Sequence, residues 1–161
     1  MHAHGEEGHV VTTASLAGLT RGNGTYGVSK HAVRALAESL NVDLVTRGSK
    51  IGSSVLCPGF VNTNIGNAER NRPANMQTSD APDVDDETFA PLVAMLKNGK
   101  DPSEVADIVI NAIKDKVFYI LPHPAWDDTI REYFDEILSR KELPPPGMAT
   151  FMTPRDDGEK Y

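Results

Sequence analysis

Apolar residues along the chain gather into short runs separated by longer helical patterns. Three runs are rich in β-branched or aromatic residues and are bounded by glycine or proline: residues 9–14, 51–56 and 117–121. Runs of this length and composition predict buried strands. The middle run is the weakest, because Gly52, Ser53 and Ser54 dilute its apolar character.

The segments between these runs show the spacing of amphipathic helices. A long helix is predicted between the first two runs, with a single apolar stripe and a stop signal at Gly48. The stripe consists of Val28, Ala32, Leu36, Leu40 and Leu44, with Val33 and Ala37 beside them. This helix would cover one face of the predicted sheet.

Two further helices are predicted in the second half of the chain. One begins at Asp101, which can cap it, with Pro102 at the first helical position and Glu104 completing a capping box. Its inward positions are Val105, Ile108, Val109, Ala112 and Ile113. The other follows Pro124, with Ile130, Tyr133, Phe134, Ile137 and Leu138 facing inward. Strands that alternate with helices predict parallel βαβ units.

Two segments depart from this alternation. Residues 66–99 form a polar insertion with an acidic cluster, followed by a short helical pattern that ends near Gly99. An insertion of this length predicts a lid, and the alternative is a plain solvated loop. Residues 144–161 form a proline-rich tail that we expect to be disordered. We therefore assign residues 1–143 to one folded domain.

Composition narrows the class of protein. A net charge of −7 argues against a nucleic-acid partner, since phosphate binding requires a basic surface. The single cysteine, Cys57, excludes an internal disulfide and favours a reducing compartment. No apolar run approaches the roughly 20 residues that span a bilayer, and the N-terminus lacks a signal-peptide pattern. We expect a soluble, cytoplasmic protein with no membrane partner.

Candidate chemistry lies around the first predicted strand and the start of the long helix. Tyr26 and Lys30 are four residues apart, so both side chains lie on one helix face. A nearby ammonium favours the phenolate form of a tyrosine, which can then exchange a proton with an alcohol or carbonyl. Ser15 follows the first strand, at the sheet edge where ligands bind in open α/β folds. Its hydroxyl can hold a substrate oxygen there.

These residues occur within three segments that together resemble the short-chain dehydrogenase/reductase family. Residues 13–19 (Thr-Ala-Ser-Leu-Ala-Gly-Leu) resemble its active-site strand and turn. Residues 26–33 (Tyr-Gly-Val-Ser-Lys-His-Ala-Val) are similar to its Tyr-x-Ala-Ser-Lys helix, and residues 58–63 (Pro-Gly-Phe-Val-Asn-Thr) to its Pro-Gly-x-Val-x-Thr turn. The match is strong over residues 9–63, and the later order of elements fits to about residue 138.

The resemblance implies a fold, an activity and a role for each residue. The fold would be part of a Rossmann-like α/β sandwich with about three parallel strands and flanking helices. The activity would be NAD- or NADP-dependent hydride transfer on an alcohol or ketone, with Tyr26 as acid/base, Lys30 assisting it and holding the nicotinamide ribose, and Ser15 orienting the substrate oxygen. The nicotinamide end would be cradled by Pro58, Gly59, Val61 and Thr63. A homo-oligomer through the long helix is also implied.

The chain departs from the family pattern in two respects. The segment from Ser15 to Tyr26 is about two residues shorter than usual, and Gly22-Asn23-Gly24 can make it turn tightly. The family's glycine-rich dinucleotide fingerprint is absent, so no helix N-terminus is available for the pyrophosphate. We therefore expect the C-terminal part of an oxidoreductase without its N-terminal βαβ units. The alternative is a non-catalytic chain that uses the same half-fold for interaction.

Several other residues have ordinary interpretations. His2, His4 and His9 lack the spacing of zinc ligands, so we expect a solvated terminus and no metal. His31 is expected on a helix surface, and Cys57 is expected to be a small buried apolar residue.

Overall fold

A computed structural model describes residues 5–21, 24–76 and 90–142 of the chain. The polypeptide divides into two compact units. The first contains the described residues up to Gly59 and from Ile108 onward, and the second contains those from Phe60 to Asp107. The sheet and its long helix belong to the first unit.

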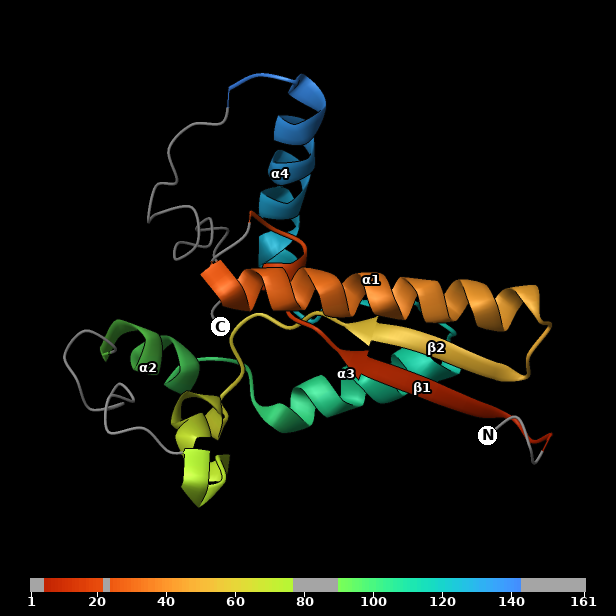
Figure 1. The fold of residues 1–161 in the computed structure, drawn as a ribbon, viewed down its shortest axis with the longest axis horizontal. Helices are drawn as coiled ribbons and strands as arrows, with labels where there is room; N and C mark the ends of the chain where they lie inside the picture. Colours follow the sequence, from red (N-terminus) through yellow and green to blue (C-terminus); the bar gives the residue numbers. More distant parts are fainter. Residues whose placement is uncertain (1–4, 22–23, 77–89, 143–161) are drawn as a thin grey trace. The chain divides into compact units, whose positions relative to one another are not determined.

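The first unit contains a parallel sheet of three strands in the order β1-β2-β3 (Figure 1). The strands are β1 (Gly8–Thr13), β2 (Ile51–Leu56) and β3 (Tyr119–Ile120). β1 and β2 pair over their whole length, and β3 joins through Ile120 opposite Leu56. The predicted Rossmann-like α/β architecture, with parallel strands and flanking helices, is confirmed. The third strand is shorter than predicted, because only Tyr119 and Ile120 pair with β2. Val117 and Leu121 at the two ends of the predicted run are exposed.

Helix α1 (Gly24–Thr46) lies along the sheet and covers the hydrophobic core (Figure 1). Ala37 and Leu44 of the helix are buried, and Val55 of β2 has no exposed surface. Ala14, Leu19 and Cys57 complete the central cluster. The small side chain at position 37 permits close approach of the helix to the strands.

The predicted apolar stripe of α1 is only partly buried. Leu44 is 5% exposed, whereas Val28 and Leu36 are 69% and 67% exposed. A helix advances about 100° per residue, so a strict four-residue spacing drifts by roughly 40° at each step. Over the stripe this drift places Val28 roughly 160° from Leu44. The prediction was therefore wrong for the first half of the four-residue repeat, whereas Val33 and Ala37 beside it do pack against the core.

Helix α4 (Asp127–Ser139) follows the short 3-10 helix η6 (Pro124–Trp126), which buries Trp126. Tyr133 is half-buried, and its ring meets that of His31 edge-on at 6.4 Å. Ile130 is also half-buried, but Phe134, Ile137 and Leu138 are exposed, so their predicted inward placement was wrong. Figure 1 shows the reason: α4 meets the start of α1 with its first turns and then extends away.

The second unit contains short helices and one pair of backbone segments. Its helices are η3 (Asn64–Asn71), η4 (Ala74–Met76), α2 (Ala90–Lys97) and the first turns of α3 (Pro102–Lys114). Val61 forms a parallel bridge with Lys100. A Cβ on Gly99 would lie 2.6 Å from the Phe60 carbonyl, so this approach requires glycine.

Helix α3 confirms its predicted start and inward face. The Asp101 carboxylate accepts hydrogen bonds from the Ser103 amide and hydroxyl at 2.8 and 2.6 Å. Val105 and Ala112 are buried. Residues 77–89 of the predicted lid and the predicted tail, residues 144–161, lie outside the described residues. Within the described part of the chain, no helix combines the length and apolarity needed to cross a membrane.

Candidate active site

Ser15 lies at the carboxyl edge of the sheet, where β1 gives way to a short turn. Its backbone is extended, and it caps the 3-10 helix η2 (Leu16–Gly18) by accepting the Ala17 amide hydrogen on Oγ at 3.2 Å. The residue is 9% exposed. Capping by its own hydroxyl therefore orients the Ser15 side chain.

The loops that follow all three strands are joined at this edge. The Leu16 amide donates to the Pro58 carbonyl at 2.8 Å, and the Ser15 hydroxyl lies 3.5 Å from the same oxygen. The next amide, that of Gly59, donates to Nδ1 of the buried His123 at 3.1 Å. Because Nδ1 is the acceptor, the proton of the neutral imidazole resides on Nε2. Hydrogen bonds thus connect the segments that carry Ser15, Pro58 and His123.

Tyr26 and Lys30 lie together near the start of α1, as their spacing predicts. The Lys30 ammonium is 5.4 Å from the centre of the Tyr26 ring. A cation at this distance is attracted by the ring face. Tyr26 is 46% exposed, so its ring is accessible to a small molecule. The structure therefore places an accessible phenol beside an ammonium.

Gly18 brings the Ser15 turn against this helix. A Cβ at position 18 would lie 2.7 Å from the Lys30 carbonyl oxygen, closer than real Cβ atoms come. Only glycine permits this contact without a shift of backbone. The turn that begins at Ser15 therefore touches α1 at the residue that carries the ammonium.

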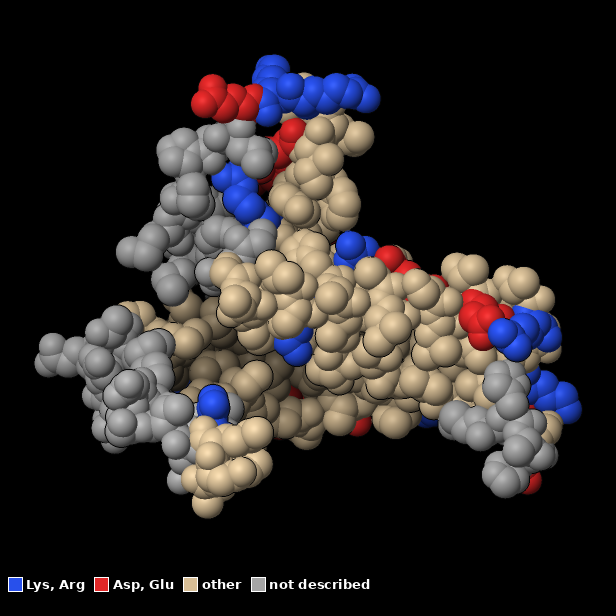
Figure 2. Space-filling view, viewed as in Figure 1, with Lys and Arg blue, Asp and Glu red and all other residues tan. Residues whose placement is uncertain are grey.

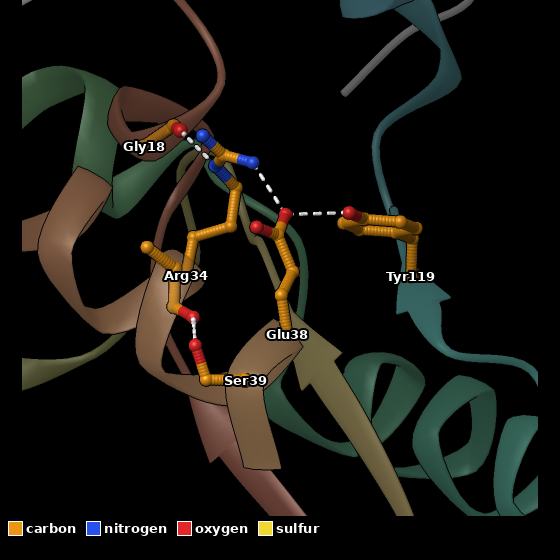
Figure 3. Close-up of polar contacts among 6 residues, drawn as sticks. Gly18, Arg34, Glu38, Ser39 and Tyr119 are labelled. Atoms are coloured by element: carbon orange, nitrogen blue, oxygen red, sulfur yellow. Dashed lines mark hydrogen bonds and ion pairs between the residues drawn. The ribbon is translucent and has the colours of Figure 1, made fainter. Parts of the chain in front are cut away.

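A chain of polar contacts extends from this turn to β3 (Figure 3). The Arg34 Nε donates to the Gly18 carbonyl at 2.9 Å, and the Arg34 guanidinium also pairs with Glu38. The Tyr119 hydroxyl donates to the same Glu38 oxygen at 2.5 Å. Burial, followed by the hydrogen bond to Glu38, raises the pKa of Tyr119, so the phenol keeps its proton. The chain joins η2, α1 and β3.

Cys57 is buried directly after β2, as predicted. Burial of the thiol raises its pKa to about 11. This effect outweighs the Ser15 backbone hydrogen bond and the nearby Arg34, which both lower the pKa. The thiol is therefore protonated and unreactive at neutral pH.

The remaining predicted cofactor residues belong to the second unit. Val61 is half-buried in its bridge to Lys100, and Thr63 is exposed. Pro58 and Gly59 belong to the first unit, so the predicted cradle of four residues spans both. Its assembly stays a prediction.

Two histidines differ from their predicted surroundings. His9 lies in β1, and its Nε2 is 2.8 Å from the hydroxyl of the buried Ser54, so this histidine is not part of a solvated terminus. His2 and His4 lie outside the described residues. His31 is half-buried and donates from Nδ1 to the Gly27 carbonyl at 3.0 Å. No group of three or more metal-binding side chains occurs in the ranges that the structure describes.

Sequence reasoning missed His123, Arg34 and Glu38. A signal for His123 was present, because it stands between two prolines directly after a predicted strand. The four-residue spacing of Arg34 and Glu38 indicates only a helix-surface ion pair. Their connection to Gly18 and Tyr119 depends on contacts across the fold.

Comparison with known proteins finds one family. A family profile described as short chain dehydrogenase matches residues 1–74. A CLA biosynthesis dehydrogenase/reductase of Lactiplantibacillus plantarum is 33% identical over 136 residues, which cover 81% of this chain and 48% of the relative. A C alpha-dehydrogenase of Sphingobium sp. is 32% identical over 140 residues, covering 86% of this chain and 45% of the relative.

A solved structure supports the same grouping. A short chain dehydrogenase/reductase from Burkholderia phymatum, crystallised in complex with NAD, superposes with a TM-score of 0.79 at 37% identity. The match covers 92% of this chain and 54% of that protein. The chain thus spans about half the length of the relatives that it matches.

Proposed function

The chain belongs to the short-chain dehydrogenase family, and we propose that it carries the acid/base half of an NAD- or NADP-dependent oxidoreductase acting on an alcohol or ketone. The observation that carries this proposal is the accessible Tyr26 phenol beside the Lys30 ammonium, on the helix that Gly18 contacts. Family membership supplies the reaction type.

In the proposed reaction, Ser15 donates a hydrogen bond to the substrate oxygen and Tyr26 exchanges a proton with it. In the oxidising direction the alcohol hydroxyl loses its proton to the Tyr26 oxygen, and the carbon–hydrogen bond breaks with its electron pair. The chemistry that a bound nicotinamide would supply is acceptance of this hydride. The Lys30 ammonium stabilises the negative charge on the Tyr26 oxygen. In the reducing direction the same groups act in reverse.

The predicted cofactor residues carry chemical groups that suit the nicotinamide end of the cofactor. Lys30 supplies an ammonium and Thr63 an exposed hydroxyl, which suit a ribose and a carboxamide. We propose that Tyr26 and Lys30 contact the ribose while Pro58, Gly59, Val61 and Thr63 hold the carboxamide side. The sequence contains no glycine-rich pyrophosphate loop, so these residues alone do not form a complete dinucleotide site.

Removal of a single hydroxyl tests the proposal. Tyr26→Phe in the full natural chain is expected to lower kcat with a secondary alcohol such as 1-phenylethanol by roughly 100-fold or more, because acid/base catalysis contributes about that much. NAD and NADP are both supplied, and absorbance at 340 nm reports turnover. Tyr133→Phe is the matched control, since it removes a hydroxyl from α4 and should leave kcat unchanged. Near-normal kcat in Tyr26→Phe would eliminate the mechanism.

A second candidate is a non-catalytic interaction protein. Among the described residues β1 pairs only with β2, so its other edge offers backbone groups for a further strand. Titration with NADH and NADPH distinguishes the two functions. For the 161-residue chain alone we expect weak or no binding, because it lacks the pyrophosphate loop. In the full natural chain, binding of either nucleotide favours the oxidoreductase, and binding of neither favours the interaction protein.

We also propose that the protein forms a homo-oligomer through α1. The outer surface of this helix is largely uncharged, with charged groups gathered toward its C-terminal end (Figure 2). Val28, Leu36 and Val42 of this helix are each more than 60% exposed. An apolar surface of this kind is typical of protein contacts. Light scattering of the full natural chain at micromolar concentration tests this, and a monomer would contradict it.

A further inference from the structure

We propose that Arg34 is a positioning residue that holds the Ser15 turn in register with the Tyr26–Lys30 pair. This inference rests on the proposed function, since it assigns a residue that acts on the same site without touching the substrate. It is carried by the hydrogen bond from Arg34 Nε to the Gly18 carbonyl.

Gly18 is rigidly linked to Ser15. Its amide donates to the Ser15 carbonyl at 2.9 Å, and the next amide, that of Leu19, donates to the Leu16 carbonyl at 2.8 Å. The Ser15 hydroxyl in turn accepts the Ala17 amide hydrogen. Because these bonds close a single turn, a force on the Gly18 carbonyl is transmitted to the Ser15 side chain.

Gly18 also rests on the backbone of α1 at Lys30. Van der Waals contact limits how close the turn can come, but it does not stop the turn from sliding along the helix. Arg34 is one helical turn beyond Lys30 and donates to Gly18 from the same helix. The contact and the hydrogen bond together determine both the separation and the position of Ser15 relative to Lys30.

Glu38 and Tyr119 hold the guanidinium in this orientation. Glu38 pairs with Arg34, and Tyr119 donates to Glu38 from β3 (Figure 3). The side chains of Arg34 and Glu38 are 23% and 32% exposed, so solvent competes only in part. A hydrogen bond from a charged donor in such surroundings is stronger than a bond between neutral groups.

The donor, rather than the charge, is the feature that the proposal assigns. The side-chain nitrogen of glutamine is attached to Cδ, as is the Nε of arginine. Arg34→Gln therefore keeps an N–H where Gly18 needs one, without the charge and without the pairing with Glu38. Arg34→Met keeps a stem of similar length but has no donor. The two variants differ at the Gly18 carbonyl.

The experiment compares these variants in the full natural chain by steady-state kinetics. Arg34→Met should lower kcat by roughly 10- to 100-fold, as expected when a reacting group is misplaced by a fraction of an ångström to one ångström. The KM for the cofactor should change by less than about threefold, because Tyr26 and Lys30 stay in place. Arg34→Gln should recover most of kcat. The matched control is Arg47→Met, which removes the equivalent four-residue ion pair at the far end of α1 and should leave kcat unchanged.

Backbone hydrogen exchange tests the same proposal without turnover. The amides of residues 17–19 should exchange at least roughly tenfold faster in Arg34→Met than in Arg47→Met, because loss of a charge-assisted hydrogen bond is of that size. Exchange in Arg34→Gln should lie between the two, because this variant keeps a hydrogen bond from a neutral donor. Equal exchange in all three variants, or equal kcat in Arg34→Met and the unaltered chain, would overturn the proposal. If the unaltered chain turns over no alcohol or ketone, the proposed function fails, and hydrogen exchange still decides whether Arg34 holds the turn.

Discussion

Helix α1 and the residue that directly follows it carry two arginine–carboxylate pairs with the same four-residue spacing but in different surroundings. Near its start, Arg34 and Glu38 are 23% and 32% exposed and are joined to Gly18 and Tyr119 (Figure 3). Near its end, Arg47 and Asp43 are 67% and 51% exposed and form an ion pair at 2.7 Å. The difference shows that local spacing creates the pair, whereas burial and neighbouring elements decide whether the pair holds a site together.

The glycines near the two ends of α1 also have different surroundings. Gly18 touches the backbone of α1, whereas Gly48, just beyond the end of the helix, has open space around it and a φ of +58°. One position requires glycine because of a neighbour, and the other because of its own backbone.

Replacement of Gly18 by alanine is expected to have the largest effect on the free energy of unfolding, and Gly48 provides the comparison. Gly18→Ala should lower the free energy of unfolding by about 3 kcal/mol, because the new Cβ would overlap the Lys30 carbonyl. Gly48→Ala should cost about 1 kcal/mol, since it meets only the strain of a left-handed backbone. Urea denaturation of the full natural chain gives both values. Equal losses would show that the Gly18 contact relaxes easily.

The next effect concerns the hydrogen bond between the loops after β2 and β3. His123→Leu should destabilise the fold by about 1–2 kcal/mol, because the Gly59 amide loses its buried acceptor. His123→Asn should recover part of this loss, since its Oδ1 can occupy the place of Nδ1. The Gly59 amide proton, followed by NMR, should move upfield in the leucine variant. An unmoved resonance would contradict the role given to His123.

Double-mutant cycles on the two ion pairs sharpen the comparison directly. The coupling between Arg47 and Asp43 should be about 0.3–0.5 kcal/mol and should fall in 1 M salt, as for exposed pairs on helices. The coupling between Arg34 and Glu38 should be about 1 kcal/mol or more and should respond less to salt, because it is half-buried. Similar couplings at low and high salt for both pairs would remove the distinction between them.

The ionisation of Cys57 is expected to have the smallest effect on stability at neutral pH. Its pKa of about 11 lies above the ordinary value, so the folded chain holds this proton more tightly than the unfolded chain does. The contribution of this protonated thiol to the free energy of unfolding is fully present below the ordinary thiol pKa. It is lost as the pH rises from there towards 11. Iodoacetamide should label the folded chain slowly at pH 7 and the urea-unfolded chain readily. Rapid labelling of the folded chain would show that the thiol is not shielded.

Much of the fold was predictable because it depends on local pattern. The strand pattern at residues 51–56, the N-cap at Asp101 and the helix that contains Ala37 each follow from neighbouring residues. The drift of a four-residue repeat around the helix follows from helix geometry, so Val28 and Leu44 could not both face the sheet. Only the tertiary structure decided that Leu44 is buried while Val28 and Leu36 are exposed. The exposed Phe134 reflects how little of α4 is covered by α1.

The same division applies to the candidate site. The sequence by itself determined that Tyr26 and Lys30 share a helix face and that Ser15 follows a strand, because covalent spacing and helix geometry set both. Only the tertiary structure decided that Gly18 rests on Lys30, that Arg34 donates to Gly18, and that Tyr119 donates to Glu38. These contacts join residues up to 81 positions apart, and no local rule of spacing specifies which distant backbone will approach.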